Sequence, residues 1–444
     1  MTLTKEQFKN QKIGTGEKLA YGVSNVGGNL VYATISSFAT IYYTDSVGIA
    51  AATVGTMMIL ARIFDAFSDI AMGTIIDRTH KKSGQAKPWF VWSIIPLVIS
   101  LILVFILPAS WGNTAKVVYM YVTYIWSAVF CFTANSLSAV SMQSLMTGSK
   151  NGRMGLNASY QIFGFITIIL VNMITSNVAA KIGWAKLSVV YAILATICLV
   201  ITAVVCKERK HLIIEEQNEE CKQRTISIKE GVSYLLKNRY VIIVLVLSIL
   251  NYITIGGFNS GGVYYATYIY NNPALFGLMT LAGMLPTILL SSLIPALGKK
   301  FSKRNVLAAG YLLQGAGYLI IQFEGTVLPV MILGLVIKGA GLAAVAGLLI
   351  PMIGDVIEYE EKKSGVRLDG MMNAIATCGI KVGTGLGLAM VGWLLQFGGY
   401  IQRAEVQSAS TISMIKLMVG GIPAICGFLG FLLAIKFDIE RVEK

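Results

Sequence analysis

Long apolar runs alternate with short polar segments along the whole chain. Many of these runs are long enough to cross a bilayer, which takes ~20 apolar residues for each helix. The run over 240–298 holds no charged residue and is long enough to cross twice, so we expect it to fold back at Asn271, Asn272 and Pro273. The pattern predicts an all-α membrane protein with twelve transmembrane helices. The predicted spans are 19–44, 46–76, 88–115, 117–149, 154–180, 187–206, two within 240–298, 305–323, 328–353, 370–402 and 417–435.

A polar segment divides the spans into two groups of six. We therefore predict an N-terminal bundle over 1–206, a cytoplasmic linker over 207–237 and a C-terminal bundle over 238–444. A short basic loop recurs in each half, GTIIDRTHKKSG over 73–84 and GKKFSKRN over 298–305. Such weak internal symmetry is typical of transporters that bind substrate between two halves. The first loop also resembles the major facilitator signature, so we expect a major facilitator fold of two pseudo-symmetric bundles.

Lysine and arginine gather in alternate loops. The loops over 44–50, 271–277 and 324–326 carry none, whereas the loops on the other side of the predicted bilayer are basic. The positive-inside rule then predicts cytoplasmic termini in the inner (plasma) membrane. The same asymmetry explains the net charge of +14, so a nucleic-acid partner is not expected. The basic residues of these loops include Lys5, Lys9, Lys12, Lys18, Lys81, Lys82, Lys87, Lys150, Arg153, Lys299, Lys300, Lys303, Arg304, Lys362 and Lys363.

Composition excludes several classes of protein. The chain is 55% hydrophobic and 13% charged, whereas a soluble domain carries ~25% charged residues. The six cysteines show no paired spacing and the two histidines, His80 and His211, lie in charged loops. A haem or zinc enzyme is therefore not expected, and no cofactor is predicted. No nucleophile–base pair or metal cluster is visible in the spans, so a membrane enzyme is the weakest alternative.

Three charges lie inside the second predicted span. Arg62, Asp65 and Asp69 are three and four residues apart, which places them on one face of a helix. An ionised side chain at the centre of a span costs ~2.5–3.5 kcal/mol, so such residues are rare and usually functional. An inert Arg–Asp ion pair would account for one acid and leave the other unpaired. We therefore predict a site for a coupling cation at Asp65 and Asp69, with Arg62 as a coupling residue.

Two lysines are the other intramembrane charges. Lys381, in the eleventh predicted span, needs a carboxylate or a polar cavity, and Asp65 and Asp69 are the candidates. Lys338, near the middle of the tenth span, either holds an anionic group of the substrate or pairs with an acid. We expect both lysines to take part in substrate binding, and Lys381 also in coupling.

Polar side chains on two further spans suit a cation and a sugar. Sodium takes oxygen ligands, which Ser136 and Ser138 of the fourth span would supply. Asn25, Asn29 and Tyr32 of the first span share one helical face, as expected of a sugar-binding wall of amides and a ring. In each case plain helix packing is the alternative.

Several motifs resemble the glycoside–pentoside–hexuronide:cation symporter family of the major facilitator superfamily. They are KLAYG, YYTDSVG, VGTMMILARIFDAFSDIAMGTIIDRT and KPW within 18–89, and DVIEYEEKKSGVRLDG at 355–370, followed by Lys381. The resemblance covers nearly the whole chain. It implies cation-coupled import of a glycoside, pentoside or hexuronide. It also implies a cation site at Asp65, Asp69 and Ser136, and a lysine linking the cation and sugar sites at Lys381.

The sugar site departs from that of melibiose-type carriers. The first-helix acid of those carriers falls on Asn29, and the fourth-helix acid falls near Ala139. The aromatic residue one turn later falls on Gln143, and the fifth-helix arginine falls near Asn157. The resemblance thus implies substrate contacts at Gln143 and Asn157 but argues against a galactoside. With Lys338 added, an anionic sugar such as a hexuronide is favoured.

We expect alternating access of a monomer whose partners are a small sugar, a monovalent cation (Na⁺ or H⁺) and the bilayer. Asp77, Arg78, Glu358 and Arg367 are predicted to form a cytoplasmic gate of salt bridges. Exposed pairs are each worth ~0–1 kcal/mol, so such a gate would open easily. A lysolipid-type symporter and an uncoupled sugar facilitator on the same fold are the alternatives.

Overall fold

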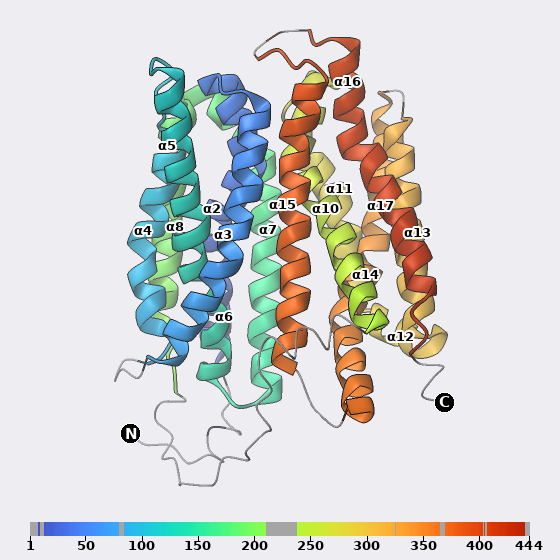
Figure 1. Cartoon of the computed structure of the whole chain (residues 1–444). Coiled ribbons are helices and arrows are strands. Elements are labelled where there is room, and N and C mark those ends of the chain that lie inside the picture. Colours follow the sequence, from blue (N-terminus) through green and yellow to red (C-terminus); the bar gives the residue numbers. More distant parts are fainter. Residues whose placement is uncertain are drawn as a thin grey trace. The chain divides into compact units, whose positions relative to one another are not determined.

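A computed structural model describes the residues Phe8, 13–79, 84–209, 238–324, 326–364, 369–402, Ala404 and 406–439. The secondary-structure elements in these ranges are helices. Contacts divide the described chain into two compact units, one of residues up to 49 and 60–209 and the other of residues 50–59 and 238–439. In Figure 1 the helices of each unit run side by side along a common direction.

The first unit runs from blue to green in Figure 1. Its helices are α2 (Thr15–Ile41), the π-helix η1 (Tyr42–Val47), α3 (Ala51–Asp77), α4 (Lys87–Phe105), α5 (Asn113–Ile125), the π-helix η2 (Trp126–Cys131), α6 (Phe132–Met146), α7 (Lys150–Ile182) and α8 (Trp184–Val205). The first residues of α3, as far as Ile59, are grouped with the second unit.

The second unit runs from yellow-green to red. Its helices are α10 (Arg239–Tyr268), α11 (Leu275–Ser291), α12 (Ile294–Phe301), α13 (Lys303–Gln322), α14 (Leu328–Ser364), α15 (Asp369–Phe397), α16 (Ala409–Lys416), the π-helix η4 (Leu417–Gly421) and α17 (Ile422–Ile435).

The helices reproduce the predicted spans. In the described part of the chain, eight helical segments are long and apolar enough to cross a membrane, or nine if α11 and α12 count as one bent span. The helices α2, α3 and α13, of 27, 27 and 20 residues, are also long enough to cross but are more polar. The predicted turn between the seventh and eighth spans is confirmed, because Asn271 adopts a φ of 50° between α10 and α11.

The irregularities that were not predicted include the three π-helices named above and a bend between α11 and α12. The predicted span over 117–149 is one helical segment that widens into a π-helical turn at Trp126–Cys131. A π-turn adds a residue to the helix and is frequent at functional sites. The axis also bends by 61° between α11 and α12, where Ile294 and Pro295 start the second helix. Both features redirect side chains within a continuous apolar run, so hydropathy alone does not reveal them.

Small residues let the helices of the second unit approach closely. Gly315 of α13 and Gly427 of α17 face each other so tightly that a Cβ at Gly427 would lie 2.5 Å from the Gly315 amide nitrogen. Lipid supplies no hydrophobic force between helices, so such contact relies on van der Waals packing of bare backbone. Beside it, the buried Tyr311 hydroxyl donates to the Leu247 carbonyl at 2.7 Å and joins α13 to α10.

The carboxylate of Glu208 closes one end of the first unit. It accepts hydrogen bonds from the amides of Gln85 (2.6 Å), Ala86 (3.0 Å) and Lys87 (2.6 Å), which lie at the start of α4. Helix N-termini present unpaired N–H groups and positive dipole ends, so an anion is stabilised there. Gly84 has a φ of 120° and lies so close that a Cβ would collide with this carboxylate.

Glu208→Gln is expected to destabilise the protein. The glutamine amide nitrogen cannot accept, so at least one of the three N–H groups loses its partner, at a cost of ~1–3 kcal/mol. The measurement is the thermal unfolding midpoint in detergent. Glu358→Gln is the control, because Glu358 is exposed and forms no ion pair among the described residues. Equal midpoints for the two variants would contradict the assigned role of Glu208.

Asp438 anchors the end of the second unit. Its Oδ1 accepts hydrogen bonds from the Tyr240 hydroxyl at 2.7 Å and from Arg239 Nη2 at 2.8 Å. The Tyr240 hydrogen bond, with the Arg239 charge, holds the pKa of the Asp438 carboxyl below its ordinary value. The charged form of Asp438 therefore stabilises the folded state.

This anchor predicts a pH dependence of stability. A carboxyl group with a depressed folded-state pKa stabilises above its ordinary pKa of ~3.9, and this contribution disappears as the pH falls toward the folded-state pKa. We expect wild type to have a higher thermal midpoint than Asp438→Asn at pH ~6, and the difference to shrink toward pH ~3. A difference that stays constant or widens on acidification would contradict this assignment.

Candidate functional site

Asp65 lies at the buried centre of a small polar cluster in the first unit. Its side chain is 8% exposed on α3. Its Oδ1 accepts a hydrogen bond from the Thr133 hydroxyl of α6 at 2.8 Å. The Ser68 hydroxyl lies 3.3 Å from the same Thr133 oxygen. Three oxygen-bearing side chains from two helices therefore converge at one point inside the bundle.

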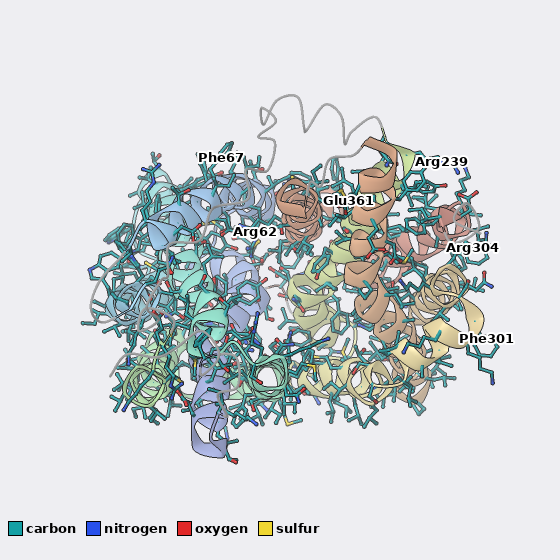
Figure 2. The ribbon with its side chains drawn as sticks, turned by 90° about the horizontal axis from the view of Figure 1, so that it is seen from below. Arg62, Phe67, Arg239, Phe301, Arg304 and Glu361 are labelled. Carbon is teal, nitrogen blue, oxygen red and sulfur yellow. The ribbon has the colours of Figure 1, made fainter. Side chains whose placement is uncertain are left out.

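Arg62 contacts the other oxygen of Asp65, but weakly. The Nη1–Oδ2 distance is 3.4 Å, whereas a strong charge-assisted hydrogen bond is ~2.7–2.9 Å long. The guanidinium carbon also lies 5.7 Å from the centre of the Tyr32 ring of α2. Figure 2 shows Arg62 toward α2 and the exposed Phe67 at the outer edge of α3. Arg62 thus contacts both an acid and an aromatic ring.

The hydroxyl of Thr133, which the sequence did not single out, donates to Asp65, and Ser136 stays a prediction for the cation site. Ser136 lies one turn further along α6, and its hydroxyl donates to the Thr133 carbonyl at 3.5 Å. The neighbouring Ser138 is buried. A signal for Thr133 was present, because Thr133 and Ser136 are three residues apart and share a helical face. Asp69 lies one turn beyond Asp65 and is half-buried.

Arg62 also lines a small cavity. Its volume is about 10 Å³, close to the ~10–15 Å³ that one water molecule needs. Arg62 Nε and the Tyr124 hydroxyl are buried with no hydrogen-bond partner among the described residues, and both residues line this cavity. The π-turn supplies part of its wall through Ser127 and Ala128. The cluster around Arg62 is therefore polar on both sides.

The two asparagines of α2 contact each other, as their spacing predicts. Asn29 Nδ2 donates to Asn25 Oδ1 at 2.7 Å. Asn25 Nδ2 donates to the Tyr160 carbonyl of α7 at 2.7 Å. Gly164 of α7 leaves the space that Asn25 fills, because a Cβ there would collide with the amide. One hydrogen-bonded pair of amides therefore joins α2 and α7, with Asn29 half-buried.

The remaining substrate candidates of the first unit are dispersed. The Tyr32 ring stacks on Phe132 with centroids 4.8 Å apart, and this stack links the asparagine face of α2 to α6. Gln143 Nε2 donates to the Arg153 carbonyl at 2.8 Å, close to the end of α6. Asn157 is exposed on α7. The structure brings Tyr32 next to Arg62, whereas Gln143 contacts the backbone at the start of α7.

Lys338 lies inside the second unit among aromatic rings. Its side chain is buried on α14, and its Nζ is 4.0 Å from the Phe258 ring centre and 5.4 Å from that of Tyr318. Gly283 and Gly317 make room for it, because a Cβ at either position would press on Lys338. No carboxylate pairs with it among the described residues, which disfavours the predicted ion-pair alternative. Cation–π contact partly offsets the desolvation of such an ammonium group.

The other predicted residues lie within α15, on α14, at the end of α3 or outside the described residues. Lys381 is half-buried on α15. Asp77 and Arg78 are exposed at the end of α3, Glu358 is exposed on α14, and none forms an ion pair within the described part of the chain. Arg367 lies outside the described residues.

Two ion pairs that the sequence did not single out form within the separate units. In the first, Arg209 contacts Glu17 with two hydrogen bonds of 2.9 Å. In the second, Lys303 contacts both oxygens of Asp355 at 2.6 and 2.7 Å. These pairs join segments distant in sequence, so spacing along one helix does not reveal them.

Known transport proteins are similar to this chain over most of its length. A family model described as MFS/sugar transport protein matches residues 20–441. The isoprimeverose transporter of Lactiplantibacillus pentosus is 28% identical over 96% of this chain and 89% of its own length. The glucuronide carrier protein homolog of Escherichia coli (strain K12) is 26% identical over 95% of this chain and 91% of its own length.

Solved structures agree on the fold. The nucleoside transporter NupG superposes with a TM-score of 0.66 over 96% of this chain and all of its own, at 14% identity. A peptide transporter in complex with alafosfalin gives a TM-score of 0.67 over 99% of each chain, also at 14% identity. The predicted all-α major facilitator fold is confirmed, and the membrane-spanning helices belong to a multi-pass membrane protein.

Proposed function

Because this chain belongs to the MFS/sugar transport protein family, we propose that it imports a glycoside, pentoside or hexuronide together with a monovalent cation by alternating access. It is a sugar transporter of the major facilitator superfamily rather than an enzyme. Relatives named as an isoprimeverose transporter, a glucuronide carrier homolog and a putative glycoside/cation symporter support the substrate class and the coupling.

The buried Asp65 is the observation that carries the cation coupling. A carboxylate inside a helix bundle is costly unless it is paired and hydrogen-bonded. The Thr133 hydroxyl donates to one of its oxygens at 2.8 Å, and Arg62 Nη1 lies 3.4 Å from the other. Carboxylate and hydroxyl oxygens are also the ligands that Na⁺ prefers. A sodium ion or a proton visiting Asp65, with Asp69 one turn away, completes the neutralisation.

Coupling follows from the cost of closing the protein around a charge. With the cation bound, the acidic cluster is nearly neutral, and its transfer away from water becomes cheaper. Sugar binding and cation binding then stabilise the same closed form, so each tightens the other by the same factor. Lys381 is the proposed link between the two sites.

The sugar side of the proposal rests on two polar features. The Asn25–Asn29 pair offers amide groups to sugar hydroxyls, beside the Tyr32 ring. Lys338 supplies an uncompensated positive charge, which suits the carboxylate of a hexuronide. The loop charges support a cytoplasmic location of both termini. Import is the proposed direction of net uptake.

The cation site is tested with Asp65→Asn and Thr133→Val. We expect Asp65→Asn to abolish cation stimulation of sugar counterflow. Thr133→Val removes a hydroxyl oxygen that is proposed to ligate the cation. If that ligand is worth ~1.5–3 kcal/mol, as a bond to a charged group is, the half-stimulating Na⁺ concentration should rise by about 10–150-fold. The measurement is counterflow in proteoliposomes over a series of Na⁺ concentrations and pH values, which also separates Na⁺ from H⁺.

Two controls make this test specific. Thr133→Ser keeps the hydroxyl and should retain cation stimulation. Thr74→Val removes an exposed α3 hydroxyl whose described partner is the Ile70 carbonyl, and it should behave as wild type. Unaltered cation stimulation in Asp65→Asn would exclude Asp65 as the cation site, whereas a wild type that no cation stimulates would replace symport by the uncoupled facilitator.

The charge of the substrate is tested with Lys338→Met. Replacing a buried charge by an apolar side chain of similar volume is often neutral for stability, so we expect a folded protein. Counterflow with matched neutral glycosides and uronides should lose at least about tenfold in uronide preference, which corresponds to ~1.4 kcal/mol. Lys436→Met, at an exposed lysine, is the control. An unchanged uronide-to-glycoside ratio in a folded Lys338→Met protein would exclude the anionic-substrate proposal.

A further inference from the structure

The break between α11 and α12 opens two adjacent hollows in the second unit. The helix axes meet at 61°, so α12 turns across the end of the unit instead of continuing α11. One hollow is lined by basic residues and the other by apolar residues. Phe301 and Asn305 line both hollows, which are therefore contiguous.

The basic hollow has a volume of about 860 Å³. Four cationic side chains line it, but Lys303 is neutralised by Asp355 at 2.6 Å. Asp438, which also lines it, is engaged by Arg239 at 2.8 Å. The three other basic residues form no ion pair among the described residues, so the hollow retains a positive charge that favours an anion. They are Lys299, Lys300 and Arg304.

The apolar hollow has a volume of about 410 Å³ and faces outward between α11, α12, α13 and α14. Three of its leucines are partly exposed: Leu293 by 54%, Leu297 by 39% and Leu313 by 43%. The small residues Ala309 and Gly310 form its floor. In a membrane protein an exposed apolar groove of this kind is a surface for acyl chains rather than for water.

Phe301 stands at the junction of the two hollows. Its ring is 53% exposed, and Lys300 Nζ lies 5.2 Å from the ring centre. Figure 2, viewed from the end at which α12 lies, shows Phe301 and Arg304 at the periphery of the second unit. Aromatic and basic side chains together mark the boundary between hydrocarbon and headgroups. The basic hollow and the apolar hollow are thus arranged side by side, as the headgroup and the acyl tail of a lipid are.

We propose that this surface binds an anionic phospholipid, with its phosphate in the basic hollow and an acyl chain in the apolar groove. Charge complementarity selects the headgroup, and the contiguous groove selects a lipid over a free phosphate. The basic loops predict that this end of the second unit is cytoplasmic. On the cytoplasmic side, basic pockets between helices bind acidic headgroups. The site lies wholly within the second unit and is independent of Asp65, so it stands apart from the proposed cation coupling.

The test measures lipid binding to the purified full-length protein. Wild type in a neutral detergent is titrated with phosphatidylglycerol or with phosphatidylcholine of the same acyl chains, and retained lipid is counted by native mass spectrometry. Lys299→Gln/Arg304→Gln removes two charges from the basic hollow. At ~1 kcal/mol for each basic residue, it should weaken phosphatidylglycerol binding by about 30-fold. The matched control Lys150→Gln/Lys186→Gln removes two exposed charges elsewhere and should bind as wild type does.

A second variant tests the groove. Ala309→Phe fills its floor with an apolar ring and leaves every basic residue in place, so it should also weaken phosphatidylglycerol binding while thermal stability without lipid is maintained. Inorganic phosphate and glycerol 3-phosphate are the competing probes, and neither should displace the lipid at equal concentration.

Three outcomes would overturn the proposal. Phosphatidylcholine binding as tightly as phosphatidylglycerol would remove the role of charge. An equal loss of binding in the Lys150→Gln/Lys186→Gln control would reduce the effect to overall charge. Displacement by inorganic phosphate, with Ala309→Phe behaving as wild type, would leave a soluble-anion pocket only.

Discussion

The energetic cost of a carboxylate inside an apolar helix bundle organises the first unit. Asp65 is 8% exposed, and its neighbours are arranged to lower that cost. Thr133 donates the short hydrogen bond, while Arg62 stays at 3.4 Å and is held on its other side by the Tyr32 ring. A fully formed ion pair would lock the site permanently. In the proposed function, the carboxylate and hydroxyl oxygens at this position receive the visiting cation.

Hydropathy was sufficient to locate the helices in the sequence, because the thickness of the bilayer sets the length of each apolar run. The turn at Asn271 and the nearly uninterrupted helix from Asn113 to Met146 both follow from apolar runs. The π-turn at Trp126–Cys131 and the bend before Ile294 did not follow, because they depend on local backbone hydrogen bonding within runs of unchanged polarity. The π-turn contributes to the site, since it lines the cavity next to Arg62.

Individual site residues were less predictable than their helical faces. The spacing of Asn25 and Asn29 predicted that they share one helical face, and on that face the two side chains contact each other. Thr133, whose hydroxyl donates to Asp65, was not singled out from the sequence, since the relative rotation of α3 and α6 is set by packing between helices. Glu208 was missed for a related reason: its partners are backbone amides of α4, which leave no mark in a side-chain pattern.

The two units solve the problem of buried charge differently. In the first, hydrogen-bonding side chains surround an acid, whereas in the second, aromatic rings surround Lys338. Hydroxyl and carboxylate oxygens discriminate between small cations by geometry, but the faces of Phe258 and Tyr318 supply only diffuse negative charge. An anionic group approaching Lys338 would therefore compete with weak partners. An acid poised for a cation and an ammonium poised for an anion are complementary requirements, which suits a transporter that carries a cation and an acidic sugar together.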